Sequence, residues 1–128
     1  MLTAGLIAAA LAALLHVYIF VMESLTWTSP RTRATFGLSE QQAQSTKELA
    51  FNQGFYNLFL AIVTAVGIGW VALGCKGIGL ALIFAGIGSM TAAALVLLLA
   101  SRDKARAAIT QGIFPTIGVI ALLVDVLS

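Results

Sequence analysis

Ionisable and amide side chains lie within stretches of this sequence that are otherwise apolar. A histidine and a glutamate end the first such stretch, and acids, amides and a tyrosine open the second. A carboxylate that orients a histidine is an arrangement used in general acid–base catalysis, and amides orient polar ligands. The candidate catalytic residues are therefore His16, Glu23 and Glu48, and the candidate ligand-binding residues are His16, Glu23, Glu48, Asn52, Gln53, Tyr56, Asn57 and Gln111.

No nucleophile or metal-binding motif accompanies this set. The single cysteine, Cys75, falls in a turn far from it, which indicates a tolerated loop thiol, with an intermolecular disulfide as the alternative. One histidine and two glutamates would supply three metal ligands, but they lack the HExxH or Glu-x-x-His spacing of known sites. We expect no metal; the sequence identifies no cofactor and leaves catalysis open.

The stretches that carry these residues have the length of membrane-spanning helices. Hydrophobic residues make up 60% of the chain and charged residues 9%. A helix of about 20 apolar residues crosses the hydrocarbon core, and no alternating strand pattern of a barrel is visible. The expected fold is an all-α integral membrane protein, a four-transmembrane-helix bundle forming a single domain over residues 1–128. Its helices are expected at about 2–23, 46–73, 77–100 and 107–127, with a cytoplasmic loop over 24–45.

The first apolar stretch has the position of a secretory signal peptide. No Lys or Arg precedes it, and it exceeds the roughly 7 to 15 apolar residues usual in a signal. We therefore expect it to remain as a permanent helix.

Basic residues predict the orientation of the helices. The connection after the first helix holds three of them and the connection after the third helix holds three more, whereas Lys76 alone lies between. The positive-inside rule makes the first two connections cytoplasmic and places both termini outside. A net charge of +2 without an aromatic-interleaved basic patch gives no reason to expect nucleic-acid binding. The six basic residues are Arg31, Arg33, Lys47, Arg102, Lys104 and Arg106.

The polar segment over residues 24–48 carries several local signals. Ser29-Pro30 predicts the end of the first helix, and Phe36-Gly37 predicts a turn. Ser39-Glu40-Gln41-Gln42 has the form of a capping box that opens a short amphipathic cytoplasmic helix. Ser45-Thr46-Lys47-Glu48 has the same form, and either begins the second membrane helix or continues the earlier one. In the first case Glu48 is a helix cap and not a site residue.

Helical spacing places most of the polar residues in one layer. With a rise of about 1.5 Å per residue, Asn57 lies about 14 Å inward from Glu48, and His16 about 10 Å inward from Glu23. Gln111 lies about 6 Å deep in the last helix by the same rise, one turn before Pro115, which removes a backbone donor. The layer in the cytoplasmic half comprises His16, Asn52, Gln53, Asn57 and Gln111.

The outer half of the bundle has few polar residues. Thr64, Ser89 and Thr91 can bond to carbonyls of their own helices. A transporter path needs a polar lining through the whole bilayer, together with broken helices or inverted repeats, and none is evident. The asymmetry favours a pocket that opens toward the cytoplasm or the inner leaflet.

The motif Asn52-Gln53-Gly54-Phe55-Tyr56-Asn57 carries a resemblance to a known family. Together with residues 16–23, the loop Phe36-Gly37-Leu38-Ser39 and the late Gln111-Gly112, it resembles the small bacterial membrane family known as domain of unknown function one-three-zero-four. The resemblance covers nearly the whole chain. It implies a multi-pass protein of the bacterial cytoplasmic (inner) membrane, in which the polar residues of helices one and two are signature positions.

A looser likeness is to the trimeric membrane enzymes of eicosanoid and glutathione metabolism. Those enzymes share the size, the four helices and a polar motif at the start of helix two. Their arginine-rich glutathione motif is absent here, where only Lys47 and Asn52 correspond to it. The likeness implies architecture and not glutathione chemistry.

Three functions follow from these observations as hypotheses. We favour binding of a small amphipathic or lipid-phase molecule, with acid–base chemistry as an option. The alternatives are a transporter or channel for a small solute or ion, and a structural or partner-binding membrane subunit whose amides join helices. Membrane lipid is the expected partner. The Gly-rich stretches predict close helix contacts within the bundle or between subunits, so we also expect a homo-oligomer.

Overall fold

The computed structural model describes all residues, 1–128, and the chain is helical throughout. The long helices are α1 (Leu2–Phe20), α3 (Glu40–Ala72), α4 (Lys76–Ala100) and α5 (Ala105–Leu127). Three short elements complete the chain: a π-helical turn, η1 (Val21–Leu25), that continues α1, the helix α2 (Pro30–Phe36), and a 3-10 turn, η2 (Arg102–Lys104). The predicted all-α class is confirmed.

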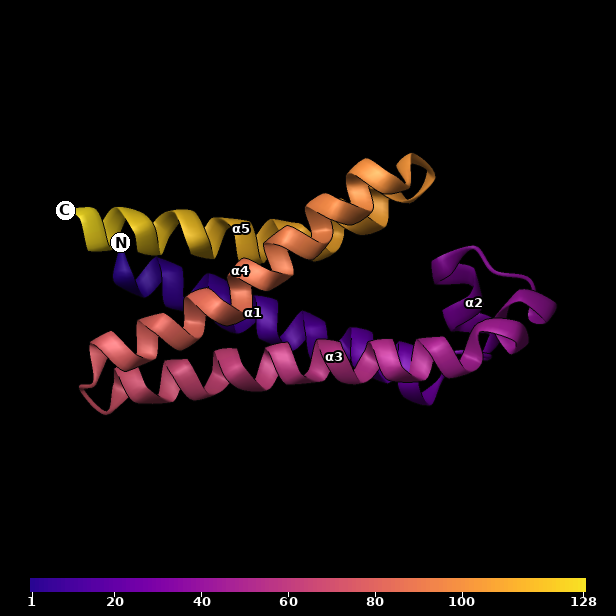
Figure 1. The fold of residues 1–128 in the computed structure, drawn as a ribbon, viewed down its shortest axis with the longest axis horizontal. Helices are drawn as coiled ribbons and strands as arrows, with labels where there is room; N and C mark the ends of the chain where they lie inside the picture. Colours follow the sequence, from indigo (N-terminus) through magenta and orange to yellow (C-terminus); the bar gives the residue numbers. More distant parts are fainter.

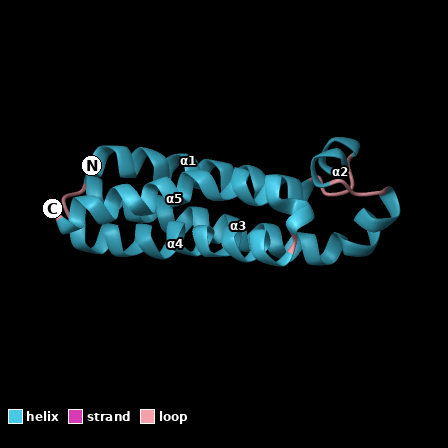
Figure 2. Cartoon of the chain, turned by 90° about the horizontal axis from the view of Figure 1, so that it is seen from above, coloured by secondary structure: helices cyan, strands magenta, loops and turns pink.

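The four long helices form a bundle in which each packs against two neighbours. α1 contacts α3 and α5, and α4 contacts the same two helices from the other side. Both termini lie at one end, which we call the terminal end, and α2 lies with the α4–α5 turn at the other, which we call the loop end (Figure 1). Seen from above, α2 and the start of α3 project beyond the other helices (Figure 2).

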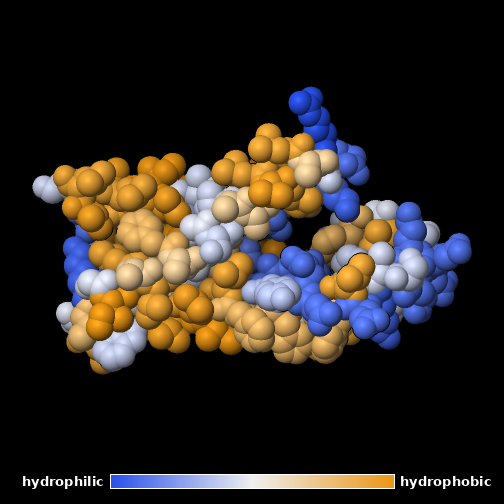
Figure 3. Space-filling view, in the orientation of Figure 1, coloured by the Kyte–Doolittle hydropathy of each residue, from blue (hydrophilic) through white to orange (hydrophobic).

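The bundle has the dimensions and surface of membrane-spanning helices. Four segments are long and apolar enough to cross a membrane: Leu2–Leu25, Glu40–Ala72, Lys76–Ala100 and Arg102–Leu127. Hydrophobic side chains cover most of the visible surface, and hydrophilic ones gather mainly at the loop end (Figure 3). Apolar side chains face outward along the bundle, as is usual for helices that cross a membrane.

Glycines allow the helices to approach closely. A Cβ added at Gly79 of α4 would lie 2.6 Å from the Gly67 carbonyl oxygen of α3, so the two backbones meet there. A Cβ at Gly86 would meet Thr64 and the Leu60 carbonyl. Both contacts lie within the bundle, which is one of the two places, within the bundle or between subunits, where the Gly-rich stretches predicted close helix contacts. Gly69, Gly77 and Gly88 face open space.

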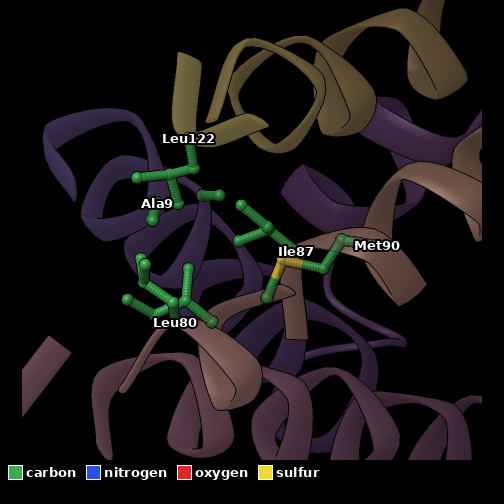
Figure 4. Packing of buried hydrophobic residues seen from close by; sticks show 7 residues of the cluster. Ala9, Leu80, Ile87, Met90 and Leu122 are labelled. Carbon is green, nitrogen blue, oxygen red and sulfur yellow. The ribbon is translucent and has the colours of Figure 1, made fainter. Parts of the chain in front are cut away.

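An apolar core fills the half of the bundle nearer the terminal end. Ile87 and Met90 of α4 and Leu122 of α5 are fully buried, and Ala9 of α1 packs beside them with Leu80 (Figure 4). Thr64, the buried polar side chain of α3 in this half, donates to the carbonyl of Leu60 at 2.8 Å. No polar path runs through this core.

A cluster around Asp125 closes the terminal end. The Asp125 carboxylate accepts from Lys76 Nζ at 2.9 Å and from the Leu2 backbone N–H at 3.0 Å. Asp125 therefore joins the start of α1, the start of α4 and the end of α5.

The helix that carries the amides begins at Glu40 and not at residue 46. Gln42 N–H donates to Ser39 Oγ at 3.1 Å, and Ser39 N–H donates to Gln42 Oε1 at 2.9 Å, so the first capping box is formed. The second box is not formed. Its hydroxyls, on Ser45 and Thr46, donate to the Gln42 carbonyl within an uninterrupted helix. Glu48 is thus an exposed residue of the helix interior and caps nothing.

The segment before α3 also differs from the predicted loop over 24–45. Ser29 and Pro30 begin a helix: Ser29 Oγ accepts from the Thr32 N–H at 3.3 Å, and proline occupies the first turn, where no N–H is needed. That helix ends at Gly37, whose φ of 67° is the left-handed conformation common at helix ends. The predicted turn at Phe36-Gly37 is confirmed, and α2 is an element that the sequence reading missed.

The two capping boxes can be distinguished experimentally. Ser39→Ala removes the side-chain acceptor at the true start of α3 and is expected to cost about 1 kcal/mol of local stability. Amide hydrogen exchange in the first turn of α3 should then be roughly five-fold faster, since about 1 kcal/mol corresponds to that factor. Ser45→Ala is the matched control and should leave these rates unchanged. Faster exchange in the Ser45 variant alone would contradict the assignment.

Candidate functional site

The polar pair that the fold brings together is Glu23 with Asn57. Asn57 Nδ2 donates to Glu23 Oε2 at 2.7 Å and, more weakly, to the Gln53 carbonyl at 3.2 Å. Glu23 Oε1 makes no hydrogen bond within the chain, and no Lys, Arg or His forms an ion pair with this carboxylate. Both residues are half-buried. An acid and an amide thus lie at a helix junction with one carboxylate oxygen still free.

The π-helical turn η1 positions Glu23 against α3. The Thr26 N–H bonds to the Val21 carbonyl at 3.0 Å, five residues back, so this turn holds one residue more than an α-helical turn. Ser24 Oγ donates to the Phe51 carbonyl at 2.7 Å and fixes the turn on α3. Such π-turns occur frequently at functional sites.

A glycine and a pair of rings complete this junction. A Cβ at Gly54 would collide with Ser24 Oγ and lie 3.1 Å from Glu23 Cβ, so only glycine admits the turn this closely. Phe20 and Phe55 meet edge to face, with ring centroids 5.1 Å apart. The end of α1 and η1 therefore pack on α3 through a close backbone contact and an aromatic contact.

His16 is buried but does not pair with Glu23. Only 2% of its surface is exposed, and its Nδ1 lies 2.8 Å from the carbonyl oxygen of Ala12. Nδ1 therefore carries the proton, since a carbonyl can only accept, and Nε2 is left as an acceptor without a partner in the chain. The histidine–carboxylate pairing that the sequence offered for acid–base chemistry is not formed.

Gln111 lies level with His16 on the neighbouring helix. Gly5 of α1 faces Leu122 of α5, and Ala9 faces Gly118, so four residues along α1 match four residues back along α5. Seven residues further along α1 from Ala9 is His16, and seven residues back along α5 from Gly118 is Gln111. Pro115 lies between and has no N–H to donate to the Gln111 carbonyl. This level thus holds a half-buried amide and a carbonyl without its helical donor.

The remaining predicted residues lie on the exposed surface of α3. Their side chains form no hydrogen bond with the rest of the chain. α3 has 33 residues, and a rise of about 1.5 Å per residue gives it a length near 50 Å, against about 30 Å of hydrocarbon. Counted back from Ala72, about 30 Å ends near residue 52, so the turns of α3 that carry Glu48 exceed the length of a membrane span, and polar side chains there need no protein partner. The exposed residues are Glu48, Asn52, Gln53 and Tyr56.

The helix pairs separate toward the loop end. α4 and α5 diverge there from α1 and α3 (Figure 1), and the surface is hollowed between the two arms, with hydrophilic side chains beside the hollow (Figure 3). We call this space the wedge. The Glu23–Asn57 pair joins η1 to α3, the helix on one side of the wedge, whereas Gln111 belongs to α5, in the arm on the other side.

Two grooves elsewhere on the bundle are apolar. One, of about 250 Å³, lies between α4 and α5 and is lined by residues such as Ala94 and Ile113. The other, of about 390 Å³, lies between α1 and α3 and is lined by residues such as Ala13 and Ile62. Neither contains a predicted site residue, so these grooves have the character of surfaces for acyl chains or for other helices.

The chemical range of the wedge is narrow. The polar groups on the helices that border it include a carboxylate and amides, and no cluster of three metal-ligating residues occurs in the structure. Cys75 is exposed at the terminal end, away from the site. These groups can bind a polar head group by charge and hydrogen bonds.

A bundle of four apolar helices with a polar junction at one end defines a class, the small all-helical proteins with the build of a membrane protein. Within that class, the chain belongs to the family described as protein of unknown function (DUF1304), which matches residues 10–123. The family resemblance seen in the residues is confirmed, and every candidate site residue lies in the matched range. No curated protein and no solved structure matches the chain.

Proposed function

We propose that this chain is an integral protein of the bacterial cytoplasmic membrane that binds a small amphipathic or lipid-phase molecule in the wedge. The observation that carries the proposal is the Glu23–Asn57 hydrogen bond. A half-buried acid is costly in apolar surroundings and by default marks a functional site. Here it lies where the two helix pairs separate, so a ligand head group would have access to it.

The proposed orientation places the wedge on the cytoplasmic side. The loop end holds every basic residue except Lys76, which lies at the terminal end beside Asp125. The positive-inside rule then puts the loop end in the cytoplasm and both termini outside. A ligand would enter the wedge from the inner leaflet.

The packing of the other half supports a closed pocket over a channel. Ile83, Ile87 and Leu122 are fully buried there, and the polar side chains bond to their own helices. Water and ions have no polar lining to follow through this core. The ligand would enter and leave by the same side.

Native mass spectrometry of the protein purified in a mild detergent tests the proposal. Wild type is expected to carry a co-purified lipophilic molecule, and Gln111→Leu is expected to lose it, because the amide on the second wall of the wedge is removed. Gln44→Leu is the matched control, since Gln44 is exposed near the start of α3. Absence of any bound molecule from wild type would exclude the proposal, and equal loss in both variants would indicate a general effect of the substitution.

A further inference from the structure

Glu23 is an acid without a counter-ion. It is the one acidic residue at the loop end that is not fully exposed; Glu40, Glu48 and Asp103 are exposed there. Both ion pairs of the structure end on Asp125 at the opposite end of the bundle. An isolated carboxylate in a region of low dielectric is unstable unless it takes up a proton or an opposite charge reaches it.

The basic residues of the loop end do not provide that charge. Five of the six are exposed, and none forms an ion pair. Arg33, the exception, lies on α2 with its Nε buried and without a hydrogen-bond partner. The chain therefore supplies no cation to Glu23, and a counter-ion for its charged form would have to come from another molecule.

The surroundings of Glu23 favour a cation with apolar substituents. Asn57 Nδ2 occupies Oε2, which leaves Oε1 to face a positive group. Phe20 and Phe55 meet beside this junction, and aromatic rings attract cations as well as alkyl groups. A strongly hydrated inorganic ion prefers several oxygen ligands, and Glu23 belongs to no cluster of three acidic, histidine or cysteine side chains.

We infer that the molecule bound in the wedge carries a positive charge, as an alkylamine or a quaternary ammonium compound does, and that Glu23 is its counter-ion. This inference rests on the proposed function and adds the charge of the ligand to it. An anionic head group would be repelled by the same carboxylate. The half-buried side-chain amide of Gln111 makes no hydrogen bond within the chain and would be free to accept from or donate to another polar group of the ligand.

Two hydrophobic ions of matched size and opposite charge test the inference. Binding of tetraphenylphosphonium and of tetraphenylborate is measured by calorimetry on the protein in phosphatidylcholine nanodiscs, with empty nanodiscs subtracted. Wild type is expected to bind the phosphonium ion at least about ten-fold more tightly than the borate, the factor that corresponds to one modest ion-pair contact. Equal affinity for both ions would overturn the inference without any variant.

Glu23→Gln assigns the effect to the carboxylate. The glutamine retains an oxygen that accepts from Asn57, so the junction keeps its hydrogen bond while the charge is removed. Its affinity for the phosphonium ion should fall about ten-fold and its affinity for the borate should not fall. Glu48→Gln removes the same charge from an exposed site and should change neither affinity by more than about two-fold.

The outcomes separate this inference from the proposed function. If mass spectrometry finds a bound lipophile but Glu23→Gln binds the phosphonium ion as wild type does, the charge assignment is wrong and the pocket remains. If mass spectrometry finds nothing bound, the proposed function fails independently of both ions. Circular dichroism of Glu23→Gln and Glu48→Gln confirms that each variant is folded before its affinities are compared with those of wild type.

Discussion

Gly79→Ala is expected to destabilise the bundle by about 3 kcal/mol or more, since inserting even one methyl group into a tight contact forces the backbones apart. The added Cβ would lie 2.6 Å from the Gly67 carbonyl oxygen and 2.7 Å from the Val71 backbone nitrogen. Neither atom can move without displacing α3. Thermal unfolding in detergent measures the loss as a lower melting temperature.

Gly77→Ala is the control for this result, because it lies on the same helix and has open space around its Cβ position. It should be neutral or slightly stabilising, since alanine has the higher helix propensity. Equal destabilisation of both variants would show that the close approach of α3 and α4 is absent in solution.

Asn57→Asp is expected to have the second large effect. The substitution keeps the shape of the side chain but replaces the N–H donor at 2.7 Å from Glu23 with a second carboxylate oxygen. Losing a hydrogen bond to a charged group costs about 1.5 to 3 kcal/mol, and the new repulsion adds to that cost. A lower melting temperature at neutral pH is the expected readout.

The loss in this variant should become smaller as the pH is lowered. One proton shared between two adjacent carboxyl groups restores a donor, so the folded state takes up a proton that the separated side chains would not. Asn52→Asp makes the same change on an exposed position without partners and should shift the melting temperature little. An equal effect at both positions would contradict the assignment of Asn57 to the junction.

Residue type and length were sufficient to predict the four long helices, although not α2. The apolar stretches exceed a bilayer span, and Ser39 with Gln42 forms the capping box that was predicted. Glu48 shows the limit of the same signal. A capping-box pattern does not start a helix when the residues before it are already helical. Here Ser45 and Thr46 donate instead to the Gln42 carbonyl of the preceding turn.

The composition of the candidate site was predicted better than its pairing. The sequence offered Glu23 or Glu48 as a carboxylate that could orient His16. The π-helical turn breaks the regular spacing, and Glu23 instead meets Asn57. Gly54, one turn before Asn57, was the available signal for a close approach. A glycine in the sequence does not show which residue packs against it, so Ser24 could not be identified as the contact of Gly54.

Hydrophobic periodicity was of little help in predicting which faces are buried. α1 and α4 are apolar around their whole circumference, as expected where the solvent is lipid. In such helices small residues mark the inner face, and the buried residues of α1 are mainly alanines. The exposed positions of Asn52 and Tyr56 depend on how far α3 extends beyond its neighbours, and a local pattern does not encode this.

The unbroken α3 has a geometric consequence for the site. It contains no proline between Glu40 and Ala72, and Trp27 Nε1 bonds to Thr46 Oγ1 at 3.1 Å, so the segment before α2 is fastened to its early turns. Asn57 lies on the same helix, about 17 Å from Thr46 at a rise of about 1.5 Å per residue. The helix α3 therefore fixes the distance between the carboxylate–amide pair and the segment before α2, so whatever holds that segment also sets the position of the pair.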